Sequence, residues 1–119
     1  MEVIADTAFG YAAGGHQVVV DGIVGPWFLD PFLERGRRTD TRLHYVVLRP
    51  TLAEALERAR TRAGPRRIAS GPIRSLHRQM SDLGRLEGHV LDTTGRGPTE
   101  TARALRRFLS AGAARLVAG

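Results

Sequence analysis

The sequence predicts an α/β fold in which parallel strands are covered by helices. Short runs of β-branched and other apolar residues at 17–21, 43–48 and 89–92 alternate with segments of helical period. The order strand, helix, strand favours a parallel sheet with helices on its faces. With 119 residues, the chain is expected to form one domain, residues 1–119.

The helices are expected from local start and stop signals. Residues 3–13 form a mild helix that ends at two glycines, and a short helix holds Phe32 before a polar turn at 36–41. Thr51 is a helix N-cap, and apolar residues follow it with the period of one buried face, at Leu52, Ala55, Leu56 and Ala59. Pro72 and Pro98 each open a further helix, since proline suits the first helical turn.

Charged residues stand where the predicted strands end. Asp21 closes a strand with three consecutive valines, Arg49 follows the second strand, and Asp92 ends the third. The carboxyl ends of parallel strands meet at one edge of a sheet, where ligands of open α/β sheets bind. The sequence therefore predicts that these three side chains share one edge.

The basic residues are unusual in kind and in distribution. The net charge is +6, and all 18 basic side chains are arginine. Seven of them lie between Glu57 and Asp82 with no acid among them, namely Arg58, Arg60, Arg62, Arg66, Arg67, Arg74 and Arg78. A guanidinium is a planar, permanently charged donor that suits phosphate. A solvated helix face is the alternative, because Glu54 precedes Arg58 by four residues and suits an ion pair.

Several classes of site have no support in the sequence. Without cysteine there is no disulfide or thiolate metal site, and no G-x-S-x-G motif indicates a hydrolase. The four histidines show no metal-binding spacing, and His77 is expected to be a hydrogen-bonded structural residue. No apolar run approaches the roughly 20 residues of a membrane span, and the first residues lack a basic signal-peptide start. A cytoplasmic location is expected.

The order of these segments resembles a known family. Residues 18–22, 43–50, 52–62 and 89–93 together look like the latter two thirds of a P-loop small-molecule kinase. The chloramphenicol phosphotransferase-like and AAA family ATP-binding proteins of bacteria are the most similar, with adenylate kinase and the zeta-toxin kinases more distant. The resemblance covers nearly the whole chain. It implies ATP and magnesium as cofactors and a small hydroxylated molecule as phosphate acceptor.

The resemblance also implies roles for residues on the nucleotide side. Asp21 would bind magnesium or face the acceptor, which makes it the catalytic and metal-binding candidate. Arg58 and Arg62 would be lid arginines over the triphosphate, and Asp92 and Thr93 would lie near the adenine. For Asp21 the local sequence leaves an alternative open, because Asp followed by Gly is also ordinary turn chemistry.

On the acceptor side, the resemblance points to the loop after Asp21. Trp27 and Phe28 lie in this loop, where relatives accommodate the acceptor molecule. Their rings would line that pocket or, as the alternative, anchor the loop in the core.

One part of the family pattern is missing from these residues. The first, central strand and the glycine-rich loop GxxxxGK[ST] have no counterpart, since the chain contains no lysine. We expect a partial fold of three parallel strands, weak ATP binding and no phosphoryl transfer by the chain alone. Valine-rich strand edges would then be unpaired and would favour a homo-oligomer.

Two other functions remain open from the sequence. The chain is alternatively a non-catalytic regulatory remnant or interaction module. A basic nucleic-acid-binding protein ranks third, because no helix-turn-helix, zinc finger or aromatic stacking platform is recognisable.

Overall fold

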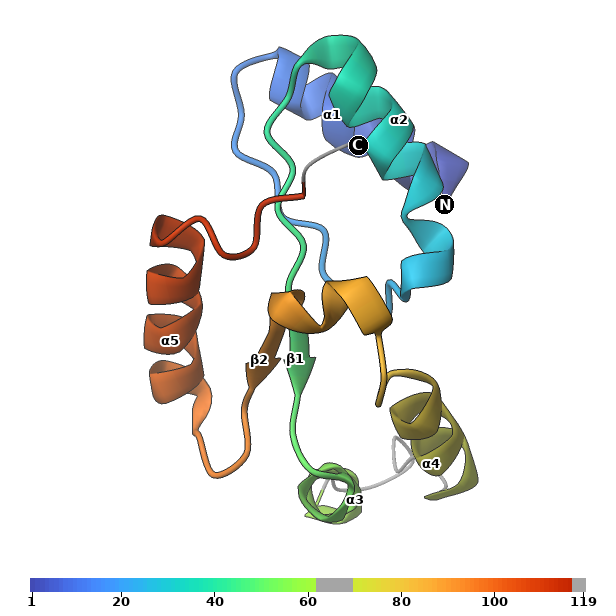
Figure 1. The fold of residues 1–119 in the computed structure, drawn as a ribbon, viewed down its shortest axis with the longest axis vertical. Coiled ribbons are helices and arrows are strands. Elements are labelled where there is room, and N and C mark those ends of the chain that lie inside the picture. The colour runs from blue at the N-terminus through green and yellow to red at the C-terminus, as the bar shows by residue number, and fades with distance from the viewer. Residues whose placement is uncertain (62–69, 117–119) are drawn as a thin grey trace. The chain divides into compact units, whose positions relative to one another are not determined.

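A computed structural model describes residues 1–61 and 70–116, which group into two compact units (Figure 1). Each unit is described by itself. The first contains residues 1–45 together with the C-terminal residues from Arg115, and its elements are α1 (Glu2–Ala13), η1 (Pro26–Phe28) and α2 (Asp30–Thr39). The second contains residues 46–114, and its elements are β1 (Val47–Arg49), α3 (Leu52–Thr61), α4 (Ser70–Gln79), η3 (Gly84–His89), β2 (Val90–Asp92) and α5 (Pro98–Ser110).

In the first unit, α1 packs on α2 around a buried arginine. Ala5 of α1 is fully buried and Phe32 of α2 is nearly so. Arg35 is only 8% exposed, and its guanidinium donates to Asp6 at 2.8 Å and to Glu2 at 2.6 Å. These carboxylates, Asp6 first, raise the pKa of Arg35. The buried cation is therefore compensated by two acids of the facing helix, as a buried charge requires.

The ends of α2 follow from its sequence. Asp30 and Pro31 open the helix, where an acidic side chain and a proline suit the first turn. Arg37 and Arg38 lie in the last turn, next to the negative end of the helix dipole. Asp40 ends the helix in the left-handed conformation, with φ of 50°. The helix thus runs to Thr39, through most of the segment expected to form a polar turn.

The second unit contains the parallel pair that the sequence predicts. Val47 pairs with Val90, Leu48 with Leu91 and Arg49 with Asp92. Val47 is buried on one face, whereas Leu48 is half exposed. Figure 1 shows β1 and β2 side by side, with α3 following β1 and α5 following β2. The mixed α/β class is therefore confirmed, with a parallel sheet of two strands among the described residues.

The helices of the second unit begin close to the expected positions. The side-chain oxygen of Thr51 accepts a hydrogen bond from the backbone N–H of Glu54 at 3.3 Å, so Thr51 caps α3 as predicted. Pro98 is the first residue of α5, also as predicted. The helix expected from Pro72 begins two residues earlier, at Ser70. Within residues 1–61 and 70–116, no helix is both long and apolar enough to cross a bilayer.

The strand predicted at 17–21 is wrong. This segment has no regular secondary structure, and Val18, Val19 and Val20 are 40%, 89% and 39% exposed. A β-branched run becomes a strand only where a neighbouring strand completes its hydrogen-bond ladder. The described residues provide no such neighbour, so two parallel strands replace the three that were expected.

The second predicted strand, 43–48, is also shorter than expected. Regular pairing begins only at Val47. Upstream of it, His44 forms a single antiparallel bridge with Arg115, and the carbonyl of Leu43 accepts a hydrogen bond from the N–H of Leu116 at 2.9 Å. Leu43 and His44 therefore pair with the C-terminal segment of the first unit instead of extending β1.

Candidate functional site

The candidate site lies at the carboxyl edge of the β1–β2 pair. The parallel register places Arg49 directly opposite Asp92, at the last position of each strand. The prediction that these two residues share one edge is confirmed. Thr93 extends the ladder by one step, because its N–H donates to the carbonyl of Arg49 at 3.4 Å. The loop after β2 is therefore held against the end of β1.

Arg49 is held in place by several acceptors. Its guanidinium makes two parallel hydrogen bonds to the carboxylate of Glu87, at 2.8 and 2.9 Å, and a third to the carbonyl of Met80 at 2.9 Å. Arg49 lowers the pKa of Glu87 to about 2, with help from the backbone N–H of Leu83. In turn, the hydrogen bond with Glu87 raises the pKa of Arg49. Arg49 therefore joins the strand end to the segment between α4 and η3, and its charge is compensated locally.

The carboxylate of Asp92 accepts hydrogen bonds from the loop that follows β2. Its Oδ1 accepts the backbone N–H of Thr94 at 2.9 Å. Hydrogen bonds from Thr94, through its hydroxyl and then its backbone, lower the pKa of Asp92. The hydroxyl of Thr94 also accepts the N–H of Thr51 at 2.9 Å, which ties the loop after β2 to the start of α3. Asp92 is thus an ionised acceptor on a fixed loop.

A small cavity opens beside these residues. Its volume is about 240 Å³. It is lined by residues of β1, α4 and β2 and of the loops that follow them, namely Arg49, Pro50, Thr51, His77, Ser81, Val90, Asp92 and Thr94. A ring nitrogen of His77 lies 3.0 Å from the carbonyl of Pro50, so the prediction of a hydrogen-bonded structural histidine is confirmed. Pro50 and Val90 give the cavity an apolar part, while Asp92 supplies an acceptor.

Arg58 approaches the same loop from α3, as expected. Its guanidinium donates to the carboxylate of Glu54 and to the carbonyl of Thr93, both at 2.9 Å, and more weakly to the carbonyl of Arg96. Glu54 also accepts the N–H of Gly95 at 2.8 Å. The ion pair with Glu54 agrees with the alternative reading of Arg58 as part of a solvated helix face, and its role as a lid arginine stays a prediction.

Thr93 is the most buried residue of this edge. It is 2% exposed, and its hydroxyl oxygen has no hydrogen-bond partner among residues 1–61 and 70–116. Its backbone carbonyl accepts hydrogen bonds from Arg58 and from the N–H of Arg96. Thr93 is therefore a buried residue whose backbone hydrogen bonds fix the loop after β2.

The other predicted site residues fall elsewhere. Asp21 is exposed and belongs to the first unit, where the strand it was expected to end is absent. Its sharing of an edge with Arg49 and Asp92 stays a prediction. Arg62 lies outside the described residues.

The aromatic pair after Asp21 is partly exposed. Trp27 and Phe28 are 50% and 39% exposed, and their rings meet edge to face with centroids 6.0 Å apart. A Cβ at position 25 would lie only 2.3 Å from the Trp27 ring, so glycine at this position lets the ring pack over the backbone. The rings are thus held by their own loop and leave surface for a ligand.

The described residues form no complete protein site for a magnesium ion. Within residues 1–61 and 70–116, no group of three or more His, Asp or Glu side chains could hold a metal. Magnesium bound to a nucleotide needs only one or two protein carboxylates, because phosphate and water oxygens complete its shell. The exposed carboxylate of Asp21 fits that role, but a protein cage for the ion does not exist in the described part.

Sequence reasoning missed Glu87. Glu87 lies 38 residues from Arg49, so no local spacing links the two. One signal was present: an arginine at the end of an apolar strand needs a carboxylate, and Asp82 and Glu87 are the only acids between Arg58 and Asp92.

Comparison with models of known protein families and with curated protein sequences gives no match.

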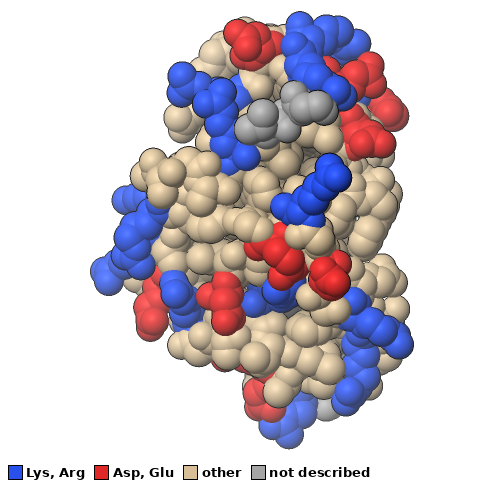
Figure 2. Space-filling model, in the orientation of Figure 1, with Lys and Arg blue, Asp and Glu red and all other residues tan. Residues whose placement is uncertain are grey.

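On the face drawn in Figure 2, acidic groups lie beside arginines at several places. This is in keeping with the ion pairs of Arg49 with Glu87, Arg58 with Glu54 and Arg60 with Glu57.

Proposed function

We propose that this chain carries part of the nucleotide site of an ATP-dependent phosphotransferase of the small-molecule kinase type. The observation that supports the proposal best is the parallel register, which brings Arg49 and Asp92 to one edge beside a cavity. Open α/β sheets bind ligands at this edge. The sequence resemblance adds the ligand class, ATP with magnesium, and the acceptor class, a small hydroxylated molecule.

In this proposal, the cavity of the second unit receives the base of the nucleotide. Because Glu87 occupies the guanidinium of Arg49, the ionised Asp92 is the main charged group left to meet a ligand. A carboxylate accepts hydrogen bonds from the amino group of a base such as adenine. Pro50 and Val90 would contact the flat apolar faces of the ring. Arg58 would lie near the loop side of the base.

The remaining roles are assigned to the first unit and to Arg62. Asp21 would hold the magnesium of the nucleotide or orient the acceptor, and Trp27 and Phe28 would contact the acceptor. Arg62 would act as a lid arginine. The reaction class is transfer of the γ-phosphoryl group of ATP to a hydroxyl oxygen, with ADP as leaving group and loss of the hydroxyl proton.

The chain alone is expected to be inactive. The phosphate loop of these enzymes uses a lysine, and these 119 residues contain none. Arginines add to a cradle of backbone N–H groups without replacing it. Calorimetry with ATP and magnesium at physiological salt should therefore show weak binding and no transfer. A micromolar, magnesium-dependent constant abolished by Asp21→Asn would mean that other residues of this chain form the cradle.

Base binding is tested by an NMR titration of the full chain with adenosine, which carries no phosphate. We expect millimolar binding, with shifts at Thr51, His77, Asp92 and Thr94. Asp92→Asn should weaken binding about fivefold or more, because it replaces an ionic acceptor with a neutral one. Asp82→Asn is a matched control, since Asp82 also accepts a backbone N–H two residues later but does not line the cavity. Equal loss in both variants, or no shifts at the cavity, would contradict the proposal.

An interaction module is the second candidate, and one observation favours it. The segment from Val18 to Phe28 exposes large apolar side chains outside any strand, including Val19 at 89%, Ile23 at 65% and Trp27 at 50%. An unpaired β-branched segment of this kind favours addition to another strand, for example in a homo-oligomer. Sedimentation of the chain with and without Val19→Lys tests this: only an oligomer that this change dissociates would support it.

A further inference from the structure

Helix α4 carries two exposed arginines that differ from those of α3. Arg74 and Arg78 lie four residues apart, and no acidic residue occurs in Ser70–Gln79. On α3, Arg58 and Arg60 each pair with a glutamate of their own helix, at 2.9 and 2.7 Å. Within residues 1–61 and 70–116, no carboxylate pairs with Arg74 or Arg78. We call these two residues the α4 arginine pair.

The acids nearest to this pair in sequence have other partners. No acidic residue occurs from Arg58 to Ser81. Beyond this stretch, Asp82 accepts the N–H of Gly84 at 3.0 Å, and Glu87 is held by Arg49. Like charges at this helical spacing repel each other, and an anion that bridges them removes the repulsion. The α4 arginine pair is therefore a place where an external anion gains more than at the paired arginines of α3.

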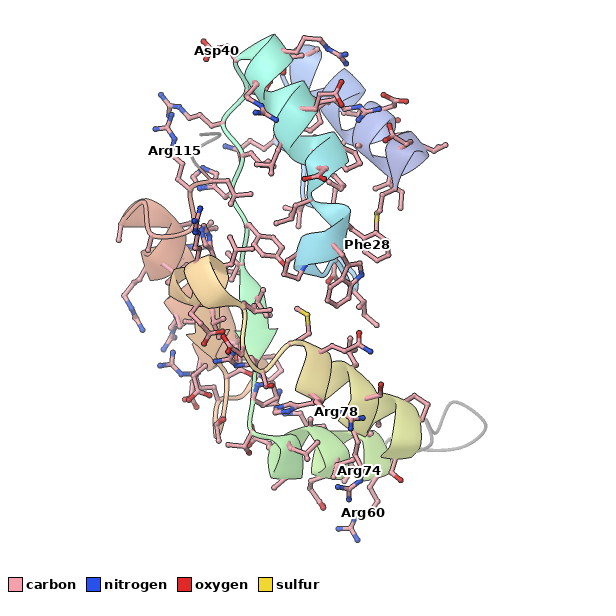
Figure 3. The ribbon with its side chains drawn as sticks, turned by 45° about the vertical axis from the view of Figure 1, so that its right-hand side comes forward. Phe28, Asp40, Arg60, Arg74, Arg78 and Arg115 are labelled. Carbon is pink, nitrogen blue, oxygen red and sulfur yellow. The ribbon has the colours of Figure 1, made fainter. Side chains whose placement is uncertain are left out.

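The chemistry of the surroundings restricts the kind of anion. Figure 3 shows Arg74 and Arg78 on the same side of α4, with Arg60 of the neighbouring α3 nearby. Neither α3 nor α4 contains an aromatic residue, and His77 contacts the carbonyl of Pro50. Bases of a single-stranded nucleic acid need aromatic rings on which to stack, and this surface has none. Guanidinium groups alone suit phosphate oxygens.

We propose that the α4 arginine pair binds linear inorganic polyphosphate. A chain of phosphates without bases presents closely spaced charges that two guanidinium groups on successive helical turns can contact together. Contacts of this kind release counterions, so the affinity falls as salt rises. The surface is distinct from the cavity at Asp92, and its function does not depend on nucleotide binding there.

The test compares two pairs of arginines that differ in their ion pairing. The α4 variant is Arg74→Gln with Arg78→Gln, and the control is Arg38→Gln with Arg58→Gln, two arginines that each pair with a glutamate of their own helix. Binding of long-chain polyphosphate to the full chain is measured at several salt concentrations. We expect the α4 variant to lose about tenfold in affinity near 0.1 M salt and its log–log salt slope to fall by about 1.5, for two lost phosphate contacts. The control should change less than threefold.

Three results would overturn the proposal. Equal losses in both variants would show that only net charge matters. A single-stranded RNA of matched charge that binds as tightly as polyphosphate would show that the phosphate chain is not the preferred ligand. A polyglutamate peptide that does so would show that carboxylates suffice.

A measurement on the unaltered chain does not depend on the folding of the variants. NMR of the arginine side chains with tripolyphosphate should shift the Nε–H signals of Arg74 and Arg78 more than those of the ion-paired Arg38 and Arg58. Equal or reversed shifts would contradict the proposal. The adenosine titration reports on the cavity instead, so either proposal can fail without the other.

Discussion

Val18–Val20 and Val47–Arg49 are similar in sequence but differ in structure. Both are short runs that begin with valine and lead to a charged residue, and both were predicted to be parallel strands. Only the second pairs with a neighbour, β2. The first has no regular secondary structure and is exposed. β-propensity therefore indicates which segments can form a strand, whereas a neighbouring strand that completes the hydrogen bonds decides which of these segments becomes one.

The largest expected effect is a difference in the free energy of unfolding between variants at Val47 and at Val19. Val47→Asp places a charge at a position that is 8% exposed, and should destabilise the chain by about 3 kcal/mol or more. Val19→Asp changes a position that is 89% exposed, and should stay within about 0.5 kcal/mol. Urea denaturation of both variants measures the difference. Comparable losses would show that residues 18–20 are buried in a strand after all.

A second, pH-dependent effect tests the anchoring of β1 by Arg49. The Arg49 guanidinium lowers the pKa of Glu87 from 4.5 to about 2, so this pair stabilises the fold fully above pH 4.5 and loses its effect as the pH falls to about 2. Glu87→Gln should therefore be less stable than the unaltered chain at neutral pH. The gap should narrow between pH 4.5 and 2 in thermal unfolding.

A glutamate outside the strand edge provides a control for the loss at neutral pH. Glu100→Gln on α5 should destabilise the chain less than Glu87→Gln, because Glu100 has no ion-pair partner in the described part of the chain. A gap for Glu87→Gln that stays constant down to pH 2 would contradict the role of the Arg49–Glu87 pair.

The smallest effect concerns two threonines of the second unit. Thr51→Val removes the N-cap oxygen of α3 and should cost about 1 kcal/mol. Thr93→Val replaces a buried hydroxyl that has no described hydrogen-bond partner, and should be neutral or stabilise by up to about 1 kcal/mol. Opposite signs in chemical denaturation are expected from these two changes of the same kind. A loss for Thr93→Val would mean that its hydroxyl makes a hydrogen bond after all.

Local signals in the sequence were sufficient for much of the fold. Thr51 and Pro98 mark helix starts because capping and proline geometry act within one turn. The placement of Arg49 opposite Asp92 also followed, because two strands joined through helices pair in parallel. The unpaired segment at 17–21 could not be predicted, since pairing depends on a partner that its own residues do not specify.

The candidate site was predictable only in part for the same reason. Arg49 and Asp92 stand at strand ends, which a pattern can locate. The acceptors that hold the Arg49 side chain, Glu87 and the carbonyl of Met80, lie more than 30 residues away and are brought near by the packing of the unit. Asp21 was assigned to a strand end on the pattern of its valines, and its role stays a prediction.

Of the two valine-rich segments, only Val47–Arg49 pairs with a neighbouring strand, and only its edge is proposed to bind a ligand. Amide hydrogen exchange of the full chain tests this claim directly. We expect protection at Arg49, Leu91 and Thr93, whose amides face the neighbouring strand in the parallel ladder, and rapid exchange at Val18–Val20. Strong protection at Val18–Val20, or rapid exchange throughout β1 and β2, would contradict it.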